Sequence, residues 1–144
     1  MVRTLVFALA ATLSLTSLSA CSGGASTTTV SADALDPNLA NPVVGDLWAA
    51  QLSHFSSASF SQPGGEAQSQ SWGLLKVVAV DPTNITVITE QGAWPQKEGA
   101  IRDLGGTLAD ISWDESERIN VVRAQLPQLV ADEKILQTRR MGAQ

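Results

Sequence analysis

Residues 72–90 contain the pattern that most narrows the folds open to this chain. Trp72–Val80 (WGLLKVVAV) is apolar at successive positions, as is typical of a central strand buried on both faces. Asp81-Pro82-Thr83-Asn84 fits a type I turn, because Asp caps its first position and Pro sets the second. Ile85–Glu90 (ITVITE) alternates and is rich in β-branched residues. The three segments predict a β-hairpin.

The sequence on both sides of this hairpin predicts further strands and one helix. Asp46–Phe55 places Trp48, Ala50 and Leu52 on one face at a period of two residues, which predicts a half-buried strand. After the hairpin we expect two short strands separated by an acidic bend, then a helix and a closing strand. These elements fall at residues 111–113, 119–122, 125–133 and 135–141.

The connecting segments are rich in turn-forming residues. Residues 56–71 are polar and contain Pro63-Gly64-Gly65, which predicts a long loop. Residues 93–111 mix Gly and Pro with isolated apolar side chains, and we expect an irregular segment with at most one short helical turn. Together, these strands, helix and connecting segments predict an α+β domain that is mainly antiparallel β. We expect a small bent sheet or half-open barrel with one short C-terminal helix.

The N-terminus has the parts of a secretory signal. A positively charged start, Met1-Val2-Arg3, precedes an apolar run over residues 5–18 that is interrupted only by Thr and Ser. The run is too short to span a bilayer comfortably, since a spanning helix needs about 20 apolar residues. It ends in Leu18-Ser19-Ala20-Cys21, which resembles the lipobox of bacterial lipoproteins.

This resemblance implies that residues 1–20 are removed and that Cys21, the only Cys, becomes a lipidated N-terminus. Ser22 follows it in place of Asp, and in bacteria with two membranes this favours the outer membrane, facing the periplasm. Two other interpretations remain: an ordinary secretory signal cleaved after Ala20, and an uncleaved membrane helix, which the length disfavours.

The rest of the chain divides into a tether and a domain. Residues 21–42 are rich in Ser, Thr, Gly and Ala, the composition of a flexible linker, and about twenty such residues have a root-mean-square span of roughly 25 Å. Asp36-Pro37 and Pro42 mark the expected boundary. We therefore expect a β-rich globular domain over residues 43–144.

Composition excludes several function classes. With 144 residues, the chain has room for one domain and a tail. Its 9 Lys and Arg against 14 Asp and Glu give a net charge of −5, which disfavours nucleic acid as a partner. A single Cys excludes an internal disulfide and a Cys-rich zinc site. We expect no metal and no cofactor.

No reactive combination of residues stands out. His54 is the only His, and no Gly-x-Ser-x-Gly motif accompanies it, so a structural role is favoured. The acidic run Asp110–Glu117 offers carboxylates for Ca²⁺ or for glycosidase chemistry, with Asp103 upstream. It lacks the spacing of a calcium loop, and a solvated acidic turn is the favoured interpretation. We expect no catalytic residues and no enzyme.

Aromatic and basic residues supply the remaining candidates. Trp48, Trp72 and Trp113 fall in strand-like segments and are expected in the core. Trp94 precedes Pro95 in a Gly-rich loop, where it is either a lid over the core or an anchor for a binding partner. The doublet Arg139-Arg140 fits a solvated strand edge better than a contact with anionic lipid or an acidic partner.

The sequence therefore predicts a membrane-anchored envelope lipoprotein whose domain binds a protein or an envelope component, as an accessory, inhibitor or immunity protein does. Partner contacts are expected at Trp94 and Pro95, and the membrane is contacted through lipid on Cys21. Two alternatives stay open. One is a structural lipoprotein without a specific partner, and the other is a hydrolase acting on wall or lipid through the carboxylates of Asp110–Glu117.

Overall fold

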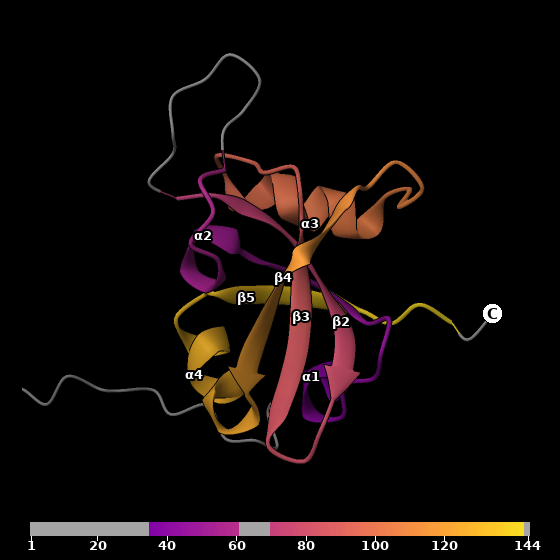
Figure 1. The fold of residues 1–144 in the computed structure, drawn as a ribbon, viewed down its shortest axis with the longest axis vertical. Coiled ribbons are helices and arrows are strands. Elements are labelled where there is room, and N and C mark those ends of the chain that lie inside the picture. Colours follow the sequence, from indigo (N-terminus) through magenta and orange to yellow (C-terminus); the bar gives the residue numbers. More distant parts are fainter. Residues whose placement is uncertain (1–34, 61–69, 143–144) are drawn as a thin grey trace, which may run out of the picture.

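The computed structural model describes residues 35–60 and 70–142, which form one antiparallel sheet with short helices around it (Figure 1). The strands follow the order β4-β3-β2-β1-β5, with β4 and β5 as edges, so the sheet does not close. Their bounds are β1 (Leu47–Gln51), β2 (Trp72–Val80), β3 (Asn84–Glu90), β4 (Trp113–Val122) and β5 (Ile135–Arg139). The predicted α+β fold with a mainly antiparallel, open sheet is confirmed.

The predicted hairpin is formed by β2 and β3. The Asp81 carboxylate accepts hydrogen bonds from the backbone N–H of Thr83 (2.7 Å) and of Asn84 (2.6 Å). The Asp81 N–H in turn donates to the Asn84 carbonyl at 2.9 Å. Because Asp and Asn stabilise turns through such local bonds, four residues are enough to reverse the chain.

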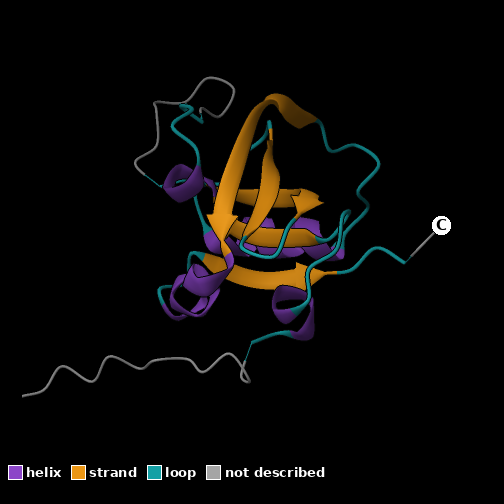
Figure 2. Ribbon diagram, turned by 60° about the horizontal axis from the view of Figure 1, so that its bottom comes forward, coloured by secondary structure: helices purple, strands orange, loops and turns teal. Residues whose placement is uncertain are grey.

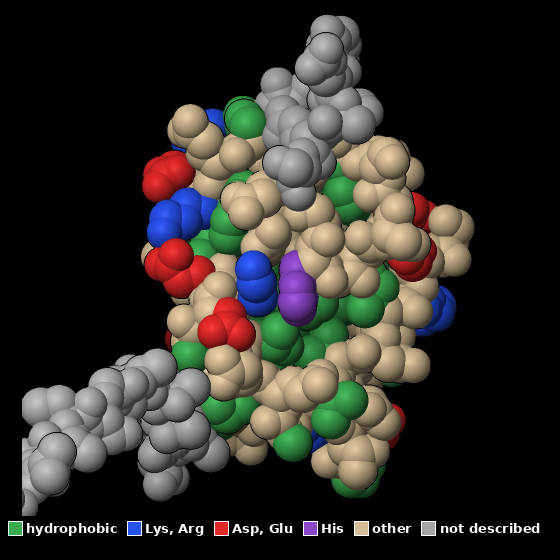
Figure 3. All heavy atoms as spheres, turned by 90° about the vertical axis from the view of Figure 1, so that its left-hand side faces the viewer, with side chains coloured by type: hydrophobic (Ala, Val, Ile, Leu, Met, Phe, Trp, Pro, Cys, Tyr) green, Lys and Arg blue, Asp and Glu red, His purple; other side chains and the backbone are tan. Residues whose placement is uncertain are grey.

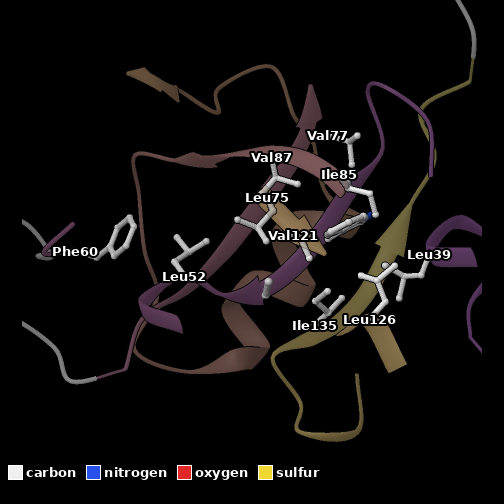
Figure 4. Packing of buried hydrophobic residues seen from close by; sticks show 12 residues of the cluster. Leu39, Leu52, Phe60, Leu75, Val77, Ile85, Val87, Val121, Leu126 and Ile135 are labelled. Atoms are coloured by element: carbon white, nitrogen blue, oxygen red, sulfur yellow. The ribbon is translucent and has the colours of Figure 1, made fainter. Parts of the chain in front are cut away.

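The centre of the sheet is buried on both faces, and Figure 2 shows it strongly bent with helices on both sides. On one face, Trp48 and Ala50 of β1 meet Leu75 and Val77 of β2 in a core (Figure 4) that also takes residues from three short helices. These helices are α1 (Pro37–Ala40), α2 (Leu52–Phe55) and α4 (Leu126–Ala131). On the other face, α3 (Lys97–Gly105) packs over β1 and β2.

Strand β1 differs from the prediction in its burial and in its end. All five of its residues are buried, because α3 covers the face that was expected to meet solvent. The chain leaves the sheet after Gln51, and α2 follows directly. Leu52 nevertheless stays in the same core as Trp48 and Ala50, as its spacing predicts.

The C-terminal helix is confirmed as α4, preceded by one 3-10 turn, η2 (Arg123–Gln125), but the irregular segment expected at 93–111 is wrong over α3. The Gly residues that argued against a helix allow it to pack closely. A Cβ atom on Gly99 would lie only 2.2 Å from the Trp94 ring, so this residue lets the indole rest on the helix backbone. Gly105 ends the helix.

Residues 113–122 form one long strand, where two short strands were expected. Asp114 pairs with Thr89, and Ile119 pairs with Val87. Between these two pairs β3 has only Ile88, whereas β4 has residues 115–118, so β4 carries the extra residues. The acidic bend is therefore a bulge within β4. The Asp114 carboxylate stabilises it locally by accepting hydrogen bonds from the N–H and the hydroxyl of Ser116.

The folded part begins before residue 43, within the stretch expected to be tether. Leu39 of α1 is 3% exposed and belongs to the core. The Asp36 carboxylate caps α1 through the Asn38 N–H (2.8 Å) and accepts a hydrogen bond from the Thr138 hydroxyl (2.7 Å). Asp36 is a favourable N-cap and Pro37 a favourable first residue of a helix, so this stretch forms α1 although its composition resembles a linker.

The predicted signal at 1–20, Cys21 and most of the predicted loop at 56–71 lie outside the described residues. Within residues 35–60 and 70–142, no helix has the length and apolar character needed to cross a membrane.

Candidate functional site

A cavity of about 370 Å³ is lined in part by Asp103 of α3. Helix α3 lies at the end of the sheet opposite α1 (Figure 1). Three chain segments surround the cavity: the end of β3 with the residues after it, helix α3, and the segment before β4. A backbone hydrogen bond from Gln91 N–H to the Ser112 carbonyl (2.8 Å) joins two of these walls. The lining residues are Glu90, Gln91, Gly92, Asp103, Asp110, Ile111 and Ser112.

Glu90 is the buried carboxyl group of this cavity, with an exposed fraction of only 4%. It is the last residue of β3, and Ile88, two residues before it on the same strand, is also buried. The neighbouring strand makes room for it. A Cβ atom on Gly73 would lie 2.4 Å from Glu90 Oε1, so any larger residue there would displace the carboxyl group.

The surroundings favour the protonated form of Glu90. Burial raises the pKa of its carboxyl group to about 7, and the nearby charge of Asp103 adds to the effect. The backbone N–H of Leu74 acts in the opposite direction, toward a lower pKa, but is too weak to offset burial. A carboxyl group that titrates near neutral pH in a cavity is a recognised mark of a functional site.

Trp94 fixes the α3 wall of the cavity. Its indole Nε1 donates a hydrogen bond to the Asp103 carboxylate, and the Arg102 guanidinium lies 4.8 Å from the ring centre. Its backbone N–H donates to the Trp72 carbonyl at 2.7 Å, and its carbonyl accepts from the Trp72 N–H at 2.9 Å. Of the two roles expected for Trp94, these contacts favour the lid over the core, whereas the adjacent Pro95 is exposed.

The acidic run of the sequence is divided by the fold. Asp110 lines the cavity, while Asp114, Glu115 and Glu117 belong to β4 and line none of its walls. Glu117 instead accepts a hydrogen bond from the Ser56 hydroxyl. Among the described residues, no group of three or more His, Cys, Asp or Glu is placed to hold a metal ion.

His54 lies on α2 and does not line the cavity. Its ring packs edge-on against Phe55, with ring centres 5.0 Å apart, and in Figure 3 the histidine borders a patch of hydrophobic side chains. Within the part of the chain that the structure describes, its ring forms no side-chain hydrogen bond. These surroundings agree with the structural role favoured from the sequence.

The arginine doublet binds groups of the domain itself, where a solvated strand edge was expected. Arg140 forms an ion pair with the fully buried Asp46, at 2.8 Å. Arg139 donates hydrogen bonds to the carbonyls of Leu104 and Gly106, at 2.8 and 3.1 Å. Both side chains tie the C-terminal segment to the rest of the domain, because a buried carboxylate and free helix-end carbonyls need partners.

Glu90 was not a candidate from the sequence, although one signal was available. In ITVITE the Glu follows Ile88 by two residues, so the strand period places it on the same face as a large apolar side chain. A charged residue at an apolar position of a strand is a feature that calls for a partner or a function. The convergence of Asp103 and Asp110 on it depends on α3, which was not predicted.

Comparisons with protein-family models, with curated proteins and with solved structures found no match to this chain.

Proposed function

We propose that this chain is a lipid-anchored protein of a bacterial envelope whose domain binds another protein or an envelope component. The observation that carries the proposal is Leu18-Ser19-Ala20-Cys21, a lipobox-like segment at the end of a short apolar run. Two or more long acyl chains on Cys21 would anchor the chain stably, since each buried methylene contributes about 0.8 kcal/mol. Where the cell has two membranes, Ser22 favours the periplasmic face of the outer membrane.

The position of the cavity is compatible with this role. Cys21 precedes the described domain, which the chain enters at Leu35 beside α1. Helix α3, which contributes Asp103 to the cavity lining, lies at the opposite end of the sheet (Figure 1). A tether on the α1 side would leave this end accessible to a partner. A concave site with converging polar groups is also the usual form of a small-ligand site.

The anchor is tested by intact-mass measurement of the chain recovered from a membrane fraction. We expect an acylated protein that begins at Cys21, and a Cys21→Ser variant that keeps the unprocessed mass and is not acylated. The matched control Ser26→Ala changes a neighbouring polar residue outside the lipobox and should be processed normally. Acylation of Cys21→Ser to the same extent as the unchanged chain would refute the anchor.

The binding role is tested by crosslinking in the native cell, followed by identification of the proteins and envelope components recovered. We expect a specific partner whose recovery falls when residues near the cavity are changed. Trp94→Ala separates the two roles of that residue: an anchor loses the partner at an unchanged melting temperature, whereas a lid lowers the melting temperature. Recovery of no specific partner would favour the structural alternative.

The second candidate function is hydrolysis of wall or lipid material, and one observation favours it. Glu90 has a pKa of about 7 and lines the cavity together with Asp103 and Asp110. A hydrolase that uses a general acid needs such a protonated carboxyl group close to a second carboxylate. The test is release of soluble products from purified wall and lipid fractions. Turnover that is abolished by Glu90→Gln and kept by Glu98→Gln would establish the enzyme, and absence of turnover would leave binding as the role.

A further inference from the structure

We propose that the cavity lined by Glu90, Asp103 and Asp110 binds a small organic cation, through the ammonium or guanidinium group of the ligand. The inference deepens the proposed binding role by naming the ligand chemistry of the site, and it does not depend on the lipid anchor. It rests on the charge of the lining, on the burial of Glu90 without a counter-charge and on the size of the space.

The lining has carboxyl groups and no basic side chain. Glu90 comes from β3, Asp103 from α3 and Asp110 from the segment that leads to β4, so three parts of the fold direct carboxyl groups to one cavity. The lining residues include no Lys or Arg. Since unpaired like charges in one cavity repel each other, a cation is the species whose binding this arrangement favours most.

Glu90 is a buried carboxyl group without a basic partner. Its exposed fraction is 4%, and the ion pairs of the described residues, Lys97–Glu133 and Arg140–Asp46, do not include it. A buried carboxylate without a counter-charge is unfavourable, and an ammonium or guanidinium group would supply that charge together with hydrogen-bond donors.

The cavity suits an organic cation better than a metal ion. Its volume of about 370 Å³ falls at the lower end of the range for small-molecule sites, which runs from about 300 Å³ upward. No three acidic, His or Cys side chains within the described ranges are arranged to hold a metal. Ile111 adds an apolar surface for the carbon skeleton of a ligand.

The walls are held in place without a ligand. The Trp94 indole holds Asp103 by a hydrogen bond, and the space left by Gly73 accommodates the Glu90 carboxyl group. Gln91 and Ser112 join the other two walls through their backbones. Preorganised groups lose little conformational freedom when a ligand binds, so even a small amine should show measurable affinity.

The experiment titrates the purified full chain with butylamine and with butanol, its neutral analogue, at about pH 8, following binding by NMR. We expect saturable binding of butylamine and none of butanol. Glu90→Gln should weaken butylamine binding at least about tenfold, the loss expected for one charge-assisted contact. Asp110→Asn should also weaken butylamine binding. Because Asp110 is exposed, this variant is expected to fold normally and keeps the test valid if Glu90→Gln disturbs the fold.

Glu98→Gln is the matched control, because Glu98 is an exposed residue of α3 that does not line the cavity. Equal binding of butylamine and butanol, or an equal loss in Glu98→Gln and Glu90→Gln, would overturn the proposal. Displacement of butylamine by calcium chloride at lower concentration would also overturn it, in favour of a metal site. If Glu90→Gln loses butylamine yet keeps the crosslinked partner, the cation site stands and the partner binds elsewhere.

Discussion

Glu90→Gln should make the stability of the domain less dependent on pH. In the folded state the Glu90 carboxyl group has a pKa of about 7, raised by burial and by Asp103 from the ordinary value of 4.5. Between these two values the folded chain holds a proton that the unfolded chain has released. The contribution of Glu90 to stability is therefore complete below pH 4.5 and is lost as the pH rises through 7.

The magnitude follows from the two pKa values. At about 1.36 kcal/mol per pH unit, the interval from 4.5 to about 7 corresponds to at most about 3 kcal/mol. Most of it, about 2 to 3 kcal/mol, is lost between about pH 5 and about pH 8. Gln has nearly the same shape as Glu and carries no charge at either pH. The variant should therefore gain about 2 to 3 kcal/mol relative to the unchanged chain over this interval.

The assay is urea unfolding of both chains at about pH 5 and about pH 8, with Glu98→Gln as the exposed control. Groups away from Glu90 contribute equally to all three chains, so the difference between chains isolates Glu90. Parallel pH profiles for Glu90→Gln and the unchanged chain would refute the reasoning, because they would mean that Glu90 does not gain a proton on folding.

Three further substitutions test the contacts around the cavity and the C-terminus. Gly73→Ala should lower the free energy of unfolding by about 2 kcal/mol, because its Cβ atom overlaps the Glu90 carboxyl group, and an unchanged urea midpoint would contradict this. Trp94→Ala should lower it by about 2 kcal/mol in the same assay, since the half-buried ring packs on Gly99 and its indole donates to Asp103, whereas unaltered stability would contradict a lid role. Arg140→Met should lower the melting temperature by leaving the buried Asp46 without its ion-pair partner, and a melting temperature equal to that of the unchanged chain would refute it.

Local patterns predicted the parts of the fold that depend on local interactions. The hairpin of β2 and β3 follows from strand periodicity and from a turn that Asp81 stabilises within four residues. The helix α4 follows from helical spacing and from Pro127 in its first turn. Each of these elements is specified by neighbouring residues, so the sequence alone is sufficient to predict it.

Elements that depend on distant contacts were missed. Helix α3 contains Gly99, a poor helix former, and the reason for it lies outside the helix, in the Trp94 ring that rests on its backbone. The early start of the domain at α1 likewise depends on Thr138, 102 residues away, whose hydroxyl donates a hydrogen bond to Asp36. The acidic cavity exists only because α3 brings Asp103 to Glu90, so no local pattern could predict it.

Stability alone does not explain the residues at this end of the sheet. A neutral or apolar residue in place of Glu90 would complete the packing at this end of the sheet without burying a carboxyl group near Asp103. A larger residue in place of Gly73 would strengthen the start of β2, because glycine weakens a strand. The chain has instead a weakened strand and a buried acid, and the first is needed to accommodate the second. A ligand that brings a positive charge into the cavity accounts for both features, because it would turn an unfavourable buried carboxylate into a satisfied one.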